Sequence, residues 1–138
     1  MIKQKEITRI TIKGTCGYVD IDHTFNDVLS ITNNSISYTY NPIYVTPNNQ
    51  YIKWSYKTNS NTFKEQFNKV VSLIPDVINY YSELRVDDVP TITFIITYSD
   101  KTRYKDIRDL MGDEYETLFA EIRKLIPQTE KIPALLEK

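Results

Sequence analysis

The sequence contains few of the residues that enzymes most often use for catalysis or cofactor binding. It has one cysteine, Cys16, one histidine, His23, and only three glycines among 138 residues. One cysteine cannot form an internal disulfide or a thiolate zinc site. Three scattered glycines form no phosphate-binding or dinucleotide-binding loop. The sequence therefore predicts no cofactor and favours a protein that is not an enzyme, without deciding that question.

Long apolar runs and a surplus of positive charge are also missing. No segment approaches the roughly 18 to 20 apolar residues of a membrane-spanning helix, and residues 1–14 lack an apolar run of signal-peptide length. We therefore expect a cytoplasmic protein with no membrane partner. The net charge is −1, whereas proteins that bind nucleic acids usually carry a basic surplus. A nucleic-acid partner is not expected, although a local basic strip would still fit this composition.

The first third of the chain has the alternating pattern of antiparallel strands. A turn at residues 15–16 would place Ile12 opposite Val19 on an apolar face. The same register would place Arg9 opposite Asp22 on the other face, where the two side chains could form an ion pair. We therefore expect a first hairpin around Cys16.

A second hairpin is predicted around Asn33 and Asn34, because asparagine tolerates the positive φ angles of a type I′ turn. This turn sets Ile31 opposite Ile36. Two prolines and a run of amides in residues 41–50 predict a loop, and the alternation in residues 51–57 predicts the next strand.

A helix is predicted to begin at Thr62, with Glu65 completing a capping box. The apolar residues that follow lie on one helical stripe: Phe63, Phe67, Val70 and Ile74. Pro75 lacks an N–H and crowds the preceding turn, so we expect this helix to stop there and a second short helix to begin, with Val77, Tyr81 and Leu84 inward.

The last third predicts a strand, a turn, a shorter strand and a long helix. Residues 91–98 alternate clearly, and a turn around Asp100 and Lys101 sends the chain back through Tyr104. The final helix carries an inward stripe: Tyr115, Leu118, Phe119, Ile122, Leu125 and Ile126. Residues 128–138 are expected to pack on the body as a short tail.

The tripeptide Leu-Ile-Pro occurs twice, at residues 73–75 and 125–127, within segments that align without gaps at an offset of 52. One interpretation is an internal duplication of a hairpin-helix unit, related by an approximate twofold. The other is coincidence, because any two amphipathic helices place large apolar residues alike. Both interpretations remain open from the sequence.

These elements predict an α+β fold with a single globular domain over residues 1–138. About seven mainly antiparallel strands would form one sheet, with two or three helices packed on one face. The sheet could be saddle-like if the chain contains a pseudo-twofold repeat. Fold alone does not carry function.

Two groups of residues have types that could carry chemistry, but their spacing argues against it. A Cys16 and His23 dyad is disfavoured, because the expected first hairpin separates the two residues. Asp20, Asp22 and Asp27 crowd around His23, but on a strand Asp20 and Asp22 would face one way and His23 the other, and the calcium-loop pattern is missing. No metal site is therefore predicted.

Tyrosine is abundant, with 11 residues, and four tyrosines fall on the predicted apolar face: Tyr38, Tyr40, Tyr56 and Tyr98. Their rings could simply fill the core. Alternatively, their hydroxyls could line a small-molecule pocket beneath the sheet, which would fit a ligand-binding protein or an enzyme.

The opposite face of the same sheet offers a flat surface of polar residues around one isoleucine: Lys53, Ser55, Lys57, Thr93, Ile95 and Thr97. Such a pattern is usually a solvated sheet face. We expect this face, or an edge strand of the sheet, to bind another protein or a second copy of the chain. The leading hypothesis is therefore a small non-enzymatic protein-binding domain, with the tyrosine-lined pocket as the alternative.

Overall fold

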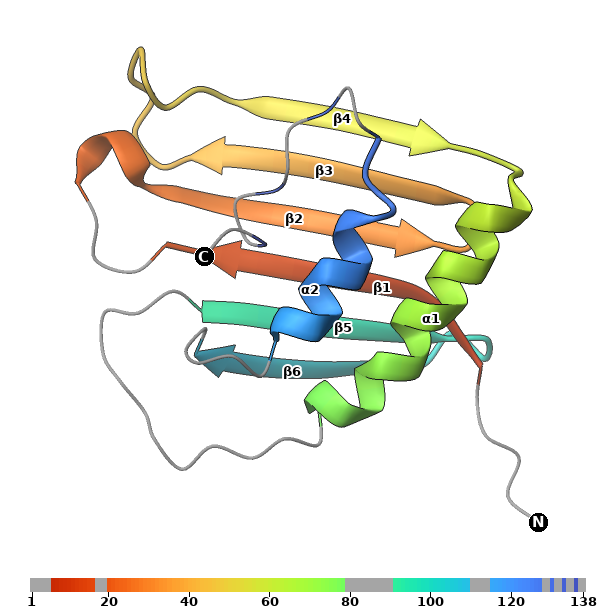
Figure 1. Cartoon of the computed structure of the whole chain (residues 1–138). Coiled ribbons are helices and arrows are strands. Elements are labelled where there is room, and N and C mark those ends of the chain that lie inside the picture. The colour runs from red at the N-terminus through yellow and green to blue at the C-terminus, as the bar shows by residue number, and fades with distance from the viewer. Residues whose placement is uncertain are drawn as a thin grey trace.

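The structure is a computed structural model that describes residues 6–16, 20–78, 91–109, 115–127, 130, 133 and 136 (Figure 1). Within these residues the chain forms six strands, one 3-10 turn and two α-helices. In chain order they are β1 (Ile7–Thr15), η1 (Ile21–His23), β2 (Phe25–Thr32), β3 (Ser35–Pro42), β4 (Ile52–Lys57), α1 (Asn61–Ile78), β5 (Thr91–Tyr98), β6 (Arg103–Asp109) and α2 (Glu116–Arg123).

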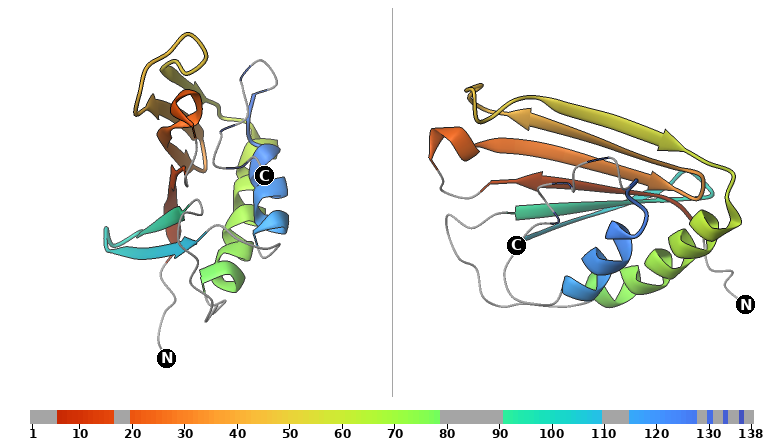
Figure 2. Two further views of the ribbon diagram at one scale, coloured as in Figure 1. Left: turned by 90° about the vertical axis from the view of Figure 1, so that its left-hand side faces the viewer. Right: turned by 45° about the horizontal axis from the view of Figure 1, so that its top comes forward.

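All six strands belong to one antiparallel sheet with the order β4-β3-β2-β1-β5-β6. Both helices lie on the same side of this sheet, so the protein has two layers (Figure 2). The α+β class and the antiparallel sheet are confirmed. The expectation of about seven strands is too high for the described part of the chain, because residues 21–23 form the turn η1 rather than a strand.

The predicted first hairpin is wrong. β1 pairs with β2 on one side and with β5 on the other, so that Ile10 lies between Ile31 and Ile96. A buried central strand needs apolar partners on both sides, and β2 and β5 supply longer apolar sets than residues 17–23. The ion pair of Arg9 with Asp22 does not form either: Arg9 Nη1 donates to Ser30 Oγ at 2.7 Å.

The other hairpins pair as predicted, but the turn at Asn33 and Asn34 is not type I′, because Lys101 is the only described non-glycine residue with a positive φ. Ile31 lies opposite Ile36, and the asparagines at 33–34 make the turn between β2 and β3. The turn between β5 and β6 contains Lys101 with a φ of 71°, in the left-handed region. The Asp100 carboxylate accepts the Thr102 backbone N–H at 3.0 Å and stabilises this turn.

The two ends of α1 differ from the prediction. The helix begins at Asn61, and Ser60 Oγ, not Thr62, accepts a hydrogen bond from the N–H of Phe63 at 3.4 Å. It also continues through Pro75 to Ile78, so the predicted stop is wrong. A proline in the last turn removes only one intrahelical hydrogen bond, and the complete burial of Ile74 holds the preceding turn against the sheet. Tyr81 and Leu84 of the predicted second helix lie outside the described residues.

The core lies between the sheet and the helices and contains the predicted stripes. Its fully or nearly buried apolar residues are Ile10, Ile12, Leu29, Ile31, Ile36, Tyr38, Trp54, Phe63, Phe67, Val70, Ile74, Ile92, Phe94, Ile96, Tyr115, Leu118, Phe119, Ile122, Leu125 and Leu136. Leu136 comes from the C-terminal segment, and Arg123 Nη1 donates to its carbonyl at 3.1 Å.

Gln66 and Glu121 join the two helices. The Gln66 amide Nε2 donates to the backbone oxygen of Glu121 at 2.9 Å and to its carboxylate at 2.7 Å. The carboxylate also lies 3.4 Å from the ammonium group of Lys69 on α1. Among the residues that the structure describes, neither helix has the length and apolar character that crossing a membrane requires.

Candidate binding face of the sheet

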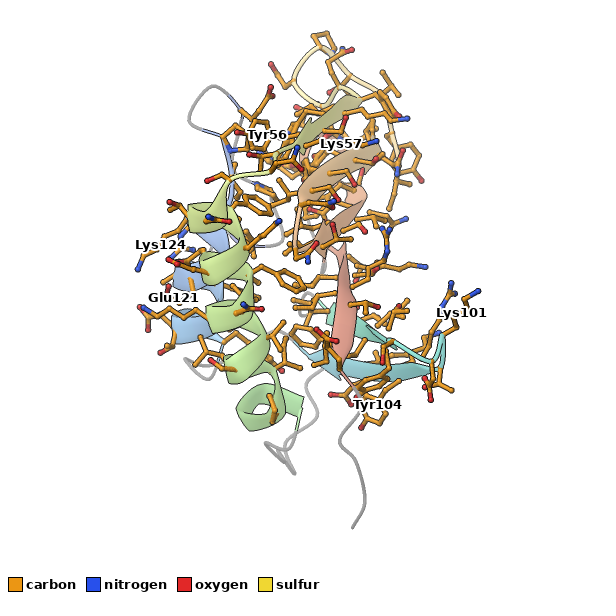
Figure 3. The ribbon with its side chains drawn as sticks, turned by 90° about the vertical axis from the view of Figure 1, so that its right-hand side faces the viewer. Tyr56, Lys57, Lys101, Tyr104, Glu121 and Lys124 are labelled. Atoms are coloured by element: carbon orange, nitrogen blue, oxygen red, sulfur yellow. The ribbon has the colours of Figure 1, made fainter. Side chains whose placement is uncertain are left out.

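The sheet face opposite the helices, called here the outward face, is covered by no described helix (Figure 2). Strand alternation decides which side chains reach it. On β4, for example, Trp54 is buried against the helices, whereas Lys53 and Ser55 are exposed on the other side. Figure 3 shows the same alternation at the end of the strand, with Tyr56 on the helix side and Lys57 away from it.

The strand register arranges the outward side chains in rows that cross all six strands. The middle row runs Ser55, Ser37, Ser30, Thr11, Ile95 and Lys105. Most of these side chains are short hydroxyls. The surface is therefore nearly flat at its centre.

Positive charge dominates this surface. Among the described side chains, its six charged residues are all cations and all exposed: Arg9, Lys13, Lys53, Lys57, Arg103 and Lys105. None of the six forms an ion pair with a described carboxylate. A chain with a net charge of −1 thus concentrates unneutralised positive charge on one face.

Protection of the sheet edges against pairing with other sheets explains only some of the cations on the outward face. Lysine and arginine on edge strands hinder unwanted pairing with other sheets, and β4 and β6 are the two edges. Arg9 and Lys13, however, belong to β1, which is paired on both sides. A paired strand has no edge to protect, so edge protection does not account for these two cations.

The sequence placed its six candidate residues on the correct face but not in one patch. Lys53, Ser55 and Lys57 lie on the edge strand β4, and Thr93, Ile95 and Thr97 lie on β5. Four strand spacings, about 19 Å, separate the two groups.

Sequence reasoning missed Arg9, Lys13, Arg103 and Lys105 as members of this face. The alternation around Ile10 and Ile12 does signal that Arg9 and Lys13 point away from the core. The predicted first hairpin also put Arg9 on the polar face, but it paired Arg9 with a carboxylate and so hid the unneutralised charge.

The four tyrosines of the alternative pocket do not converge. The Tyr38 hydroxyl donates to Asp27 at 2.8 Å, and the Tyr40 hydroxyl donates to Asn49. Tyr56 is 43% exposed and packs beside the ring of Phe63. Tyr98 lies on β5, opposite Ile7 of β1, well away from β3 and β4.

The surroundings of Tyr40 keep its phenol uncharged. Burial raises the pKa of its phenol, and the nearby Asp27 carboxylate raises that pKa further. The phenol is therefore held in its protonated form, in which it can donate to Asn49. This is a structural hydrogen bond rather than the arrangement of a catalytic base.

The cysteine and the histidine have separate partners. Cys16 Sγ accepts the backbone N–H of Phe25 at 3.4 Å. His23 Nδ1 bonds to the Asp20 carboxylate, and this hydrogen bond raises the pKa of the imidazole above 6.5. Asp22 and His23 lie in η1 and Asp20 directly precedes it, so the prediction that Asp20 and Asp22 face away from His23 on a strand is wrong. Within the described ranges, no group of three or more histidine, cysteine, aspartate or glutamate side chains could hold a metal ion.

Comparison with known proteins adds no family to these observations: no family model matches the chain, and no curated protein matches it significantly.

Proposed function

We propose that this chain is a non-enzymatic protein-binding domain that recognises an acidic protein surface through its outward face. One observation carries the proposal: the exposed cations of this face, including two on the central strand, have no described carboxylate partner. Electrostatic complementarity of this kind speeds association and selects partners by charge. The setting we propose is the cytoplasm, where a lone cysteine such as Cys16 stays reduced.

A protein partner fits the face better than a nucleic acid does. β-Sheets that bind single-stranded nucleic acids stack the bases on exposed aromatic rings. In the described strands, no outward position holds an aromatic residue or a histidine, and most of these positions hold serine, threonine, asparagine, lysine or arginine. Carboxylates can pair with the cations of such a face without stacking.

The partner is also expected to be a different protein rather than a second copy. Two copies joined through the same face would be related by a twofold axis, which brings each surface against itself. Lys13 and its neighbouring cations would then oppose one another. Like charges facing each other disfavour such a dimer.

We further propose that the two helices descend from a duplicated hairpin-helix unit. α1 follows the edge strand β4, and α2 follows the opposite edge strand β6, as an approximate twofold requires. The two Leu-Ile-Pro sequences support this relation. Superposing β3-β4-α1 on β5-β6-α2 tests it, and different chain paths in the two units would reject the duplication.

The proposed function can be tested before the natural partner is known, with poly-L-glutamate as the probe. We expect wild-type protein to bind this polymer, with an affinity that falls as salt is added. Lys13→Glu should weaken binding severalfold. Lys64→Glu makes the same change of charge on the helix layer and should leave binding nearly unchanged. Replacing Lys53, Ile95 and Thr97 together should abolish binding and leave thermal unfolding nearly unchanged.

Three results would contradict the proposal. The first is no binding of poly-L-glutamate at low salt. The second is an equal loss of binding in Lys13→Glu and in Lys64→Glu, which would indicate a general effect of net charge. The third is tighter binding of a single-stranded oligothymidylate than of poly-L-glutamate, which would make the partner a nucleic acid.

A further inference from the structure

Exposed apolar side chains gather at one end of the sheet. Eight large apolar or aromatic side chains are exposed in the described part of the chain, and five of them lie in η1 or in the segment between β3 and β4. These five are between 52% and 70% exposed: Ile21, Ile43, Tyr44, Val45 and Tyr51. We call this group the apolar end; Figure 1 shows the β3-β4 connection beside η1.

The backbone that presents the apolar end is held in place by polar contacts. Asn49 is only 2% exposed, and its amide nitrogen donates to the carbonyl oxygens of Thr24 at 2.7 Å and Tyr44 at 3.0 Å. Its side-chain oxygen accepts the hydroxyl of Tyr40. The backbone N–H of Ile43 donates to the Thr24 carbonyl at 3.2 Å. The loop is thus preorganised, although its apolar side chains are not used in the core.

The size and charge of the apolar end limit what it can bind. Residues 41–52 contain no charged side chain, so this surface suits an apolar pocket. A few side chains cover far less than the roughly 800 Å² that each partner buries in a stable interface. The apolar end therefore cannot hold a second copy of the chain or another protein alone. It leads directly into Lys53 at the start of β4, on the outward face.

We propose that the apolar end and the outward face form one continuous interface, whose partner carries an apolar pocket beside its acidic surface. This inference rests on the proposed function. The cations orient the partner and speed its approach, and the apolar end supplies the desolvated contact that slows dissociation. Tyr44 is the expected anchor, because tyrosine offers a large contact area at a low cost in conformational entropy.

Two polymers separate the two parts of the interface: poly-L-glutamate and a random copolymer of glutamate and tyrosine. Wild-type protein should bind the copolymer severalfold more tightly, because only the copolymer combines carboxylates with apolar rings. Replacing Ile43, Tyr44 and Val45 together by serine should abolish this advantage and leave the affinity for poly-L-glutamate unchanged. Replacing Tyr56 and Tyr104, which are exposed on the helix side of the two edge strands, is the matched control and should preserve the advantage. Circular dichroism and thermal unfolding verify that each variant is folded.

The outcomes distinguish this inference from the proposed function. Failure to bind poly-L-glutamate overturns the proposed function and this inference with it. Binding of both polymers with equal affinity, or a copolymer advantage that survives the triple serine replacement, overturns the inference alone. Tighter binding to phosphatidylserine vesicles than to the copolymer, lost in the serine variant, would assign the apolar end to a lipid surface and likewise overturn it.

Discussion

The hydroxyl of Tyr38 on β3 donates a 2.8 Å hydrogen bond to Oδ2 of Asp27 on β2, and both side chains are almost completely buried. Burying a carboxyl group is costly unless hydrogen bonds compensate for the lost water. Replacing Tyr38 by phenylalanine keeps the ring and removes this donor. We expect Tyr38→Phe to lower the free energy of unfolding by about 1–3 kcal/mol, measured by urea titration. Tyr104→Phe, at a 43% exposed tyrosine, is the control; an equal loss in both variants would contradict the prediction.

The free energy of unfolding is expected to depend on pH through the carboxyl group of Glu121. The hydrogen bond from Gln66 and the contacts with Lys124 and Lys69 lower the pKa of its carboxyl from 4.5 to about 2. A carboxyl with a lowered folded-state pKa contributes stability above its unfolded pKa, and this contribution is lost as the pH falls towards the folded pKa. We expect Glu121→Gln to be less stable than wild type near neutral pH.

This difference should shrink between pH 4.5 and about 2. Urea midpoints at a series of pH values measure it. Glu65→Gln, at an exposed position of α1, provides the comparison and should show a smaller pH-dependent difference. A Glu121→Gln deficit that stays constant down to pH 2 would show that the carboxylate charge is not responsible.

Replacing Pro75 is expected to stabilise the folded protein. It lies within α1 and is exposed, so alanine can replace it without disturbing the core. Alanine restores an N–H for the Val71 carbonyl and removes the crowding of the proline ring. We expect Pro75→Ala to raise the free energy of unfolding by about 1–3 kcal/mol. Asn68→Ala, exposed earlier in the same helix, measures the effect of alanine propensity alone. A lower stability of Pro75→Ala than of wild type would mean that the proline is needed where α1 ends.

Trp54 offers a spectroscopic test of the two-layer packing. It is the single tryptophan, it is 7% exposed, and its indole nitrogen has no hydrogen-bond partner among the described residues. Its ring packs against that of Tyr38, with centroids 5.8 Å apart. We expect blue-shifted fluorescence that resists quenching by acrylamide and shifts to the red on unfolding. A water-like emission from the folded protein would contradict the burial of this face.

The outward face shows where sequence reasoning succeeded and where it stopped. Alternation alone placed Lys53 and Ile95 on the side opposite the core, because successive side chains on a strand point to opposite faces. It did not show that four strand spacings separate them, or that Arg9 and Lys13 stand between the two edges. The charge of this face depends on the order of the strands, which no single segment contains.

The sequence by itself determined the local elements: the hairpin at Asn33 and Asn34, the strand through Phe94, and the apolar stripes of both helices. Each depends on a periodicity within a short window. Tertiary structure decided the partners of β1, since Ile10 can pair with Ile96 only after the intervening chain has folded back. It also carried α1 past Pro75, because burial of Ile74 offsets a local preference to stop. Packing between distant segments thereby brought the cations together on the outward face, and no local sequence pattern specifies that arrangement.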